Sequence, residues 1–197
     1  AIAEKGERML PFYRSFILWR DLYPVWGGEI DWLYAGRGII TFTNELWSRN
    51  NMFRSSDTGD IAQYDFNKYL LFDQGWVKWH EFDHPTYGKI EIGGKRKEFG
   101  RVPPSFLLEE ECHRNMAFTL YHADEMPRLS FGEIKIESLG NDVYRVWIEV
   151  KNDGMIPTRA QWDVQNNISS PDFMTVEGSN VQVLSSGTVT DPYFKEV

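Results

Sequence analysis

The sequence predicts an α/β region followed by a small β-sandwich, and three observations support this prediction. Residues 38–47 form a short, β-branched and nearly continuous apolar run, which is typical of a strand buried on both faces. Residues 61–72 and 105–125 place apolar side chains at helical spacing. After about residue 127 the pattern changes to apolar and polar residues that alternate with period two, as in strands.

The remaining part of the first region gives weaker signals. Residues 9–19 are apolar and fit either a helix or a strand. A glycine pair at 27–28 predicts a turn, and the many Pro and Gly residues of 76–104 predict an irregular segment. Pro127 is expected to stop the second helix.

The alternating segments are 130–140, 141–154 and 175–184, separated by Gly, Asn and Asp turns. The roughly 70 residues after position 127 have room for about five strands, fewer than the seven of a full sandwich. We therefore predict two parts, residues 1–126 and a small β-sandwich at 127–197.

Composition excludes several classes of protein. The 197 residues are 42% hydrophobic and carry a net charge of −8, which argues against a disordered tail and against a nucleic-acid binder. The absence of an 18-residue apolar run predicts no membrane span. Cys112 is the single cysteine, so neither an internal disulfide nor a multi-cysteine metal site is possible within this sequence. Eight Trp and 15% aromatic residues suggest a large core or a ligand cleft.

The most informative residue is Glu45, which follows the apolar run 38–47. A carboxylate at the end of a buried strand costs desolvation energy, and ligand sites of α/β sheets lie at the carboxyl ends of strands. Thr43 shares the side of Glu45 because strand side chains alternate. Tyr23 precedes the glycine pair at 27–28 and could close over a ligand. From these features alone, two simpler interpretations also remain open: Glu45 could lie at the surface at the end of a strand, and Tyr23 could lie in the core.

The stretch from Tyr23 to Leu46 resembles the C-terminal part of the zinc carboxypeptidases of the carboxypeptidase A type. The residues that carry the resemblance are Tyr23, Gly27, Gly28, Ile30, Asp31, Trp32, Tyr34, Phe42, Thr43, Asn44, Glu45 and Leu46. They are dispersed and stand in the order and spacing of the family, which is more specific than one short motif. The resemblance covers about residues 8–75, including the helix predicted at 61–72. It implies that 1–126 is the C-terminal part of a mixed-sheet α/β/α catalytic domain.

The resemblance also implies roles for individual residues. Glu45 would be the general base for a zinc-held water and then the acid for the leaving amine. Tyr23 would be a mobile clamp, and Ile30 and Thr43 would line the pocket for the C-terminal side chain of a peptide or protein substrate. An apolar Ile30 favours an apolar or aromatic C-terminal residue. The implied activity is that of a metallocarboxypeptidase, a hydrolase that is secreted or periplasmic.

The zinc cofactor is expected to be held outside this sequence. The family binds the metal through His-x-x-Glu and a distant His, all upstream of the tyrosine. Residues 1–22 contain no His, and all four histidines follow Glu45. The expectation is therefore a chain cut from a larger protein, with the missing N-terminal part of the catalytic domain as its partner, and inactive in isolation.

Two alternatives remain open. A non-catalytic peptide- or glycan-binding scaffold module, a pseudo-carboxypeptidase, would keep the same residues as relics. His80 and His84 also satisfy the His-Glu-x-x-His pattern of zincin metalloproteases, which requires a helix. Pro85 and the aromatic 76–79 run oppose a helix there, so we expect an aromatic loop.

Other reactive-looking residues have simpler interpretations. Cys112 and His113 are adjacent on the predicted helix, where side chains diverge by about 100°, so we expect a buried thiol and a half-exposed imidazole rather than a catalytic pair. Residues 109–111 are three glutamates, interpreted as a solvated helix face. The aromatic cluster within 76–87 is expected to pack against a neighbouring domain rather than to stack sugars.

Overall fold

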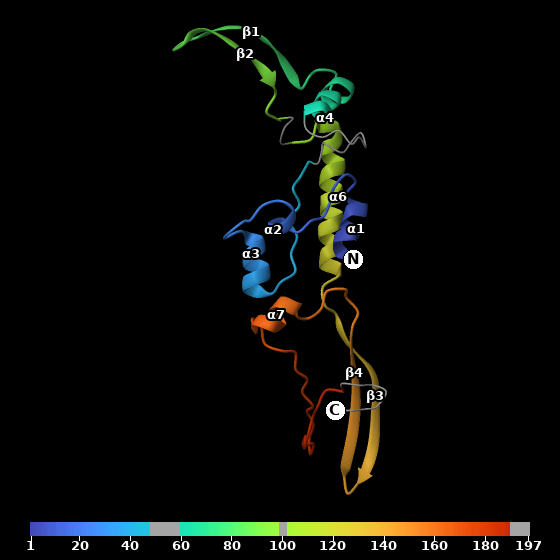
Figure 1. Ribbon diagram of the computed structural model, residues 1–197. Helices are drawn as coiled ribbons and strands as arrows, with labels where there is room; N and C mark the ends of the chain where they lie inside the picture. Colours follow the sequence, from blue (N-terminus) through green and yellow to red (C-terminus); the bar gives the residue numbers. More distant parts are fainter. Residues whose placement is uncertain (48–59, 99–101, 190–197) are drawn as a thin grey trace.

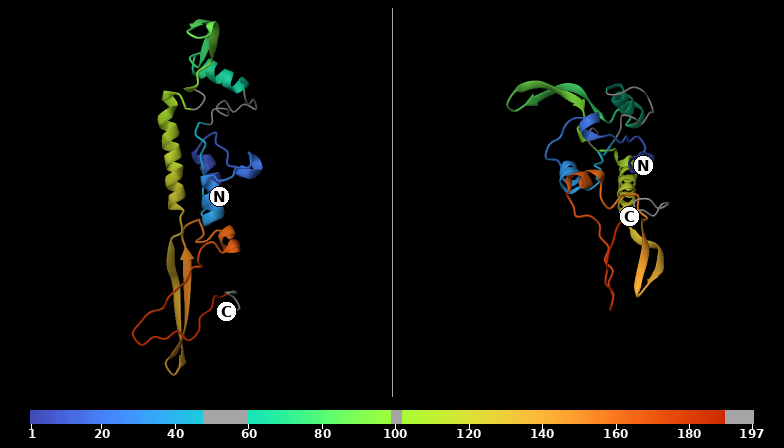
Figure 2. Two further views of the ribbon diagram at one scale, coloured as in Figure 1. Left: turned by 90° about the vertical axis from the view of Figure 1, so that its left-hand side faces the viewer. Right: turned by 60° about the horizontal axis from the view of Figure 1, so that its bottom comes forward.

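The computed structural model describes residues 1–47, 60–98 and 102–189. A long helix, α6 (Ser105–Asp124), forms the middle of an elongated molecule. One β-hairpin lies beyond each end of this helix, and the N-terminal helix α1 (Ile2–Met9) lies alongside it (Figures 1 and 2). None of the helices in these residues is long and apolar enough to cross a membrane.

The described residues combine helices with two small antiparallel sheets, so the coarse α/β prediction is confirmed. Each sheet has two strands: β1 (Trp76–His84) pairs with β2 (Gly88–Lys95), and β3 (Leu129–Gly140) pairs with β4 (Val143–Asn152). Residues 38–47 are not a strand in the structure. A buried strand needs a neighbouring strand on each side, and the described residues supply none there, so the segment packs on α6 instead.

Both predicted helices are confirmed. α6 begins directly after Pro104, whose fixed φ suits a helix start, and it ends before Pro127. The helix predicted at 61–72 is observed as α4 (Asp60–Asp65), which continues as the π-helical turn η3 (Phe66–Leu70). Helical periodicity over several turns is a local signal and survives in the folded chain.

The N-terminal region contains short helices joined by irregular chain. After α1 come α2 (Leu18–Asp21), α3 (Glu29–Asp31) and the π-helical turn η1 (Trp32–Gly36). Residues 9–19, which the sequence left open between helix and strand, form neither as a whole.

The prediction of an irregular segment at 76–104 is wrong, because β1 and β2 form a hairpin within it. Pro85 lies in the turn, Gly88 begins β2 with a φ of 70°, and Gly94 near the end of β2 has a φ of 103°. These residues therefore punctuate the strands rather than interrupt them. The expected packing of the aromatic cluster is also not observed, since its largest members are exposed on the hairpin: Trp76, Trp79, Phe82 and Tyr87.

The strands predicted at 130–140 and 141–154 are confirmed as β3 and β4. Asn141 and Asp142 both have positive φ, as a tight two-residue hairpin turn requires. The strand predicted at 175–184 is not formed, and the helix α7 (Gln161–Asn166) was not predicted. Among the described residues the predicted sandwich thus contains two strands.

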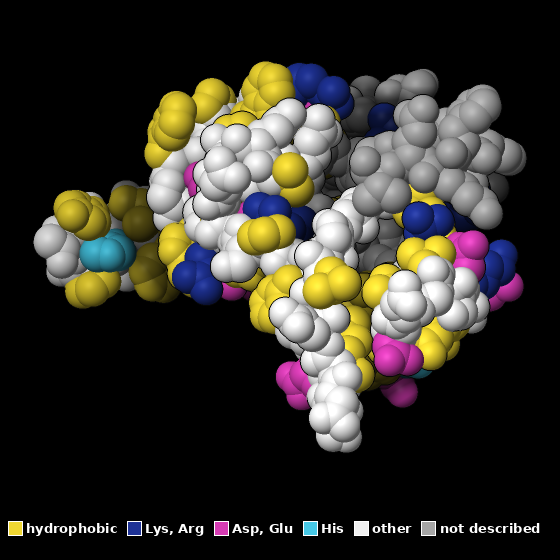
Figure 3. Space-filling view, turned by 90° about the horizontal axis from the view of Figure 1, so that it is seen from below, with side chains coloured by type: hydrophobic (Ala, Val, Ile, Leu, Met, Phe, Trp, Pro, Cys, Tyr) yellow, Lys and Arg dark blue, Asp and Glu magenta, His cyan; other side chains and the backbone are white. Residues whose placement is uncertain are grey.

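The buried side chains form two small clusters on α6 and near α4. Ile2 and Leu10 pack against Phe118, which joins the α1 region to α6. Trp47 packs with Phe66 and Leu71 in a second cluster, which includes Leu107 near the start of α6. Elsewhere hydrophobic side chains reach the surface, as the view from the β3–β4 end shows (Figure 3).

Candidate functional site

The segment that carries Glu45 is attached to α6 through Phe42, Asn44 and the backbone of Trp47. The Phe42 ring meets the rings of Phe118 and His122 edge to face, with centroids 5.6 and 5.0 Å apart. Asn44 Nδ2 donates a hydrogen bond to Asn115 Oδ1 at 2.9 Å. One side of the extended segment is therefore fixed against the helix.

Other residues of the same segment are exposed. Thr43, Glu45 and Leu46 lie on the surface, whereas Phe42 and Asn44 are half-buried and Trp47 is buried. Glu45 makes no hydrogen bond or ion pair with any residue that the structure describes. Its carboxylate is therefore accessible to a ligand or to another part of the protein.

Trp47 ends this segment and is anchored by its backbone. Its N–H lies 3.0 Å from Glu111 Oε1 and 3.2 Å from Tyr13 Oη, both of which accept from it. Tyr13 in turn donates its hydroxyl proton to Glu111. Burial raises the pKa of Tyr13, and the hydrogen bond to the Glu111 carboxylate raises it further.

This arrangement corrects two predictions for α6. Glu109 and Glu110 are solvated as predicted, but Glu111 is half-buried and binds two other segments. Cys112 is exposed rather than buried, and His113 is exposed rather than half-exposed, because the α6 face that packs on α1 is centred on Phe118.

Sequence reasoning missed Tyr13, Glu111 and Asn115 as a group. A signal was present for two of them, because Glu111 and Asn115 are four residues apart on one helix face. Asn115 Nδ2 donates to the Glu111 backbone oxygen at 2.9 Å. Tyr13 could not be added, since it is 98 residues away in the sequence from Glu111.

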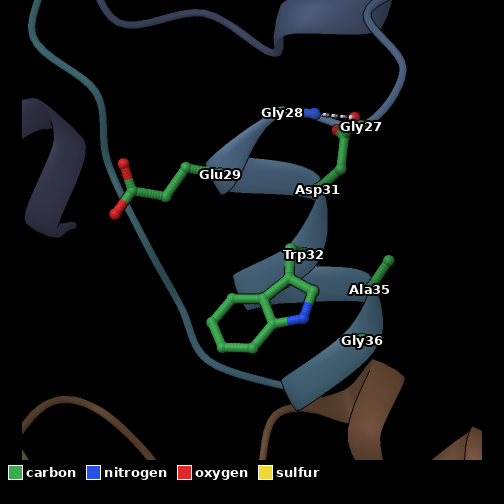
Figure 4. A pocket seen from close by; sticks show the side chains of 7 residues that line it. All are labelled: Gly27, Gly28, Glu29, Asp31, Trp32, Ala35 and Gly36. Carbon is green, nitrogen blue, oxygen red and sulfur yellow. Dashed lines mark hydrogen bonds between the residues drawn. The ribbon is translucent and has the colours of Figure 1, made fainter.

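An open depression lies over α3 and η1, with a volume of about 620 Å³ (Figure 4). The residues that line it are Gly27, Gly28, Glu29, Asp31, Trp32, Ala35 and Gly36. The Gly28 N–H lies 3.4 Å from Asp31 Oδ2, and the Glu29 carboxylate points away from Asp31. Gly27 has a φ of 73°, a conformation that a side chain would strain.

The predicted site residues are not gathered around this depression. Tyr23 is 54% exposed and lies outside its lining. Ile30 is half-buried between two lining residues without being one of them. Thr43 and Glu45 lie on the separate segment along α6. The roles assigned to all four therefore stay predictions from the sequence.

Helix α7 packs against η1, which lines the depression. Trp162 Nε1 donates a hydrogen bond to the Ala35 oxygen at 3.1 Å, and its ring stacks on Tyr34. Asp163 lies against Gly38, where an added Cβ would come within 2.6 Å of the Asp163 Cβ. Helix α7 of the C-terminal region is thus in direct contact with residues 34–38.

Among the residues that the structure describes, no three His, Cys, Asp or Glu side chains are grouped as metal ligands. His80 and His84 lie on strand β1, so the zincin pattern lacks the helix that it requires. Four residues along a strand separate them by about 13 Å.

Comparison with known proteins identifies one region. Residues 128–192 match DUF8731, a domain family of unknown function. The match begins at β3 and continues through β4, α7 and the segment beyond it. No curated protein and no solved structure matches the chain.

Proposed function

We propose that this chain is the C-terminal part of a zinc metallocarboxypeptidase of the carboxypeptidase A type, which hydrolyses the C-terminal peptide bond of peptides or proteins. The observation that carries the proposal is the ordered resemblance between Tyr23 and Leu46, which ends in Phe-Thr-Asn-Glu-Leu. Such an enzyme would be secreted or periplasmic.

Glu45 is the residue of this chain that acts in the reaction. Its carboxylate accepts a proton from the attacking water and returns it to the leaving amine. Its exposed position beside Thr43, with no partner among the residues that the structure describes, is consistent with a group that meets its substrate at a surface shared with another part of the protein. A zinc ion held by another part of the enzyme would polarise the scissile carbonyl.

The exposed apolar side chains within residues 16–46 support the proposal that another part of the protein covers this region. Trp26 is 91% exposed and Trp19 is 70% exposed, which is unusual for such large apolar groups. The N-terminal part of a catalytic domain would cover them. It would also supply the strands beside residues 38–47, completing a mixed-sheet α/β/α domain.

The C-terminal region is proposed to be a small β-sandwich. A two-stranded hairpin such as β3–β4 is marginal alone, because both of its faces are largely exposed. The DUF8731 match joins this hairpin to residues 175–184, whose alternation suits further strands. This segment is not a strand in the structure, and in the proposed sandwich it would pair as one and cover one face of β3–β4.

The test of the catalytic proposal is Glu45→Gln in the intact protein that contains this chain. The amide keeps the size of the side chain but cannot accept the proton, so kcat for peptide hydrolysis should fall about 100- to 10,000-fold. Glu91→Gln, an exposed carboxylate on β2, is the matched control and should hydrolyse at the wild-type rate. Undiminished hydrolysis by Glu45→Gln would refute the role of Glu45, and peptide binding without hydrolysis by the wild type would favour a pseudo-carboxypeptidase.

A further inference from the structure

We propose that Tyr13, Glu111 and Asn115 are positioning residues for Glu45. They hold the segment on which Glu45 lies and do not themselves meet the substrate. The inference rests on the proposed function, because it assigns them a purpose only if Glu45 transfers a proton.

The contacts of these residues lie on both sides of Glu45 in the chain. Before it, Asn44 Nδ2 donates to Asn115 Oδ1 at 2.9 Å. After it, the Trp47 N–H is shared between Glu111 Oε1 at 3.0 Å and Tyr13 Oη at 3.2 Å. A carboxylate carried by a segment that is held on both sides keeps its position while its side chain stays exposed.

The three residues also hold one another. Tyr13 donates its hydroxyl proton to Glu111, and Asn115 Nδ2 lies 3.4 Å from both the Tyr13 hydroxyl and Glu111 Oε1. Glu111 is therefore the common acceptor for the α6 helix, the chain after α1 and the Glu45 segment. Charged acceptors form stronger hydrogen bonds than neutral ones, which favours Glu at this position over Gln.

The backbone of Trp47 gives an independent reason for such an anchor. Its φ of 73° lies in the left-handed region, which bulky residues rarely adopt. A strained backbone persists where its surroundings hold it, and such strain concentrates at functional sites. The indole is buried against Phe66, so Trp47 is fixed by its ring as well as by its N–H.

The experiment compares Glu111→Ala, Glu111→Gln and Tyr13→Phe in the intact protein that contains this chain. Steady-state hydrolysis of a peptide is measured together with hydrogen exchange of residues 42–47. Glu109→Ala, which removes an exposed carboxylate from the same helix, is the control. We expect Glu111→Ala to lower kcat about 10- to 100-fold with KM within about twofold, because a small displacement of a catalytic group is costly.

The other variants separate positioning from folding. Glu111→Gln can still accept the Trp47 N–H and should recover most of the kcat, and Tyr13→Phe should show a smaller loss than Glu111→Ala. Exchange should accelerate in 42–47 while β3–β4 is unchanged. Unchanged exchange and kcat in Glu111→Ala would overturn the inference, as would exchange that rises throughout the molecule. Absence of hydrolysis by the wild type would instead overturn the proposed function, whereas the exchange data would still report on the contacts.

Discussion

The contact between α1, α6 and residues 42–47 differs from the β3–β4 hairpin in how it is held together. The first joins segments far apart in the sequence through buried rings and shared hydrogen bonds, with Phe118 at its centre. The second has long, regular pairing between neighbouring strands, but nearly all its side chains are exposed. Regular local structure and buried packing are therefore separate properties of this chain, and they should respond differently to substitution.

Among the substitutions that test this difference, Phe118→Ala should lower the stability of the protein most. Phe118 is 5% exposed, and it touches Gly6 so closely that a Cβ there would lie 2.6 Å from its ring. Truncating it removes buried area and leaves a cavity, which should lower the free energy of unfolding by about 3–5 kcal/mol. Denaturant unfolding, followed by the helical circular dichroism signal, measures this change.

Leu120→Ala is the matched control for Phe118→Ala. Leu120 lies on the same helix but is 62% exposed, so its truncation should change stability by less than about 0.5 kcal/mol. Equal losses in the two variants would mean that the packing of α1 on α6 does not stabilise the centre of the molecule.

The pH response of α7 tests the link between the two regions. The Arg159 guanidinium and the Ser169 hydroxyl and N–H hold the pKa of Asp163 at about 2. A lowered carboxyl pKa stabilises the fold above the unfolded value of 3.8, and this contribution is lost as the pH falls toward 2. Protection of α7 from hydrogen exchange, relative to the intrinsic rate at each pH, should therefore fall from about pH 4 downward, before that of β1–β2.

Asp163→Asn gives the control for this pH response. It removes the titrating group, so the difference in protection between α7 and β1–β2 should no longer change between pH 4 and pH 2. A pH response that persists in Asp163→Asn would assign the effect to other groups. Protection of residues 33–39 should fall together with that of α7, because Trp162 and Asp163 contact Ala35 and Gly38.

The same contrast explains what the sequence could predict. β3–β4 and α6 were predicted because alternation, the Asn141–Asp142 turn and helical spacing are local signals. Residues 38–47 were predicted as a strand from their apolar run, but a strand also needs partners, which the described residues do not supply. β1–β2 was missed because the Pro and Gly of its turn suggested irregular chain.

The candidate site shows the same division. Glu45 and Thr43 were identified from the sequence, and their exposure on one side of the segment follows the period of extended chain. Their attachment to α6 could not be predicted, because Asn44 meets Asn115, and Tyr13 meets Glu111, only in the folded chain. Local patterns thus predict which residues to test, whereas long-range contacts determine what holds them.

Lys89→Ala on the other hairpin should have the smallest effect. Lys89 Nζ and Glu81 Oε1 are 2.7 Å apart across β1 and β2, but both side chains are more than half exposed. Water and salt screen such a pair, so its loss should cost no more than about 0.5 kcal/mol, measured by denaturant unfolding. Since the strands are joined by backbone hydrogen bonds, hairpin exchange should also be nearly unchanged. A loss approaching that of Phe118→Ala would show that the exposed hairpins, and not the α1–α6 contact, govern the stability of this chain.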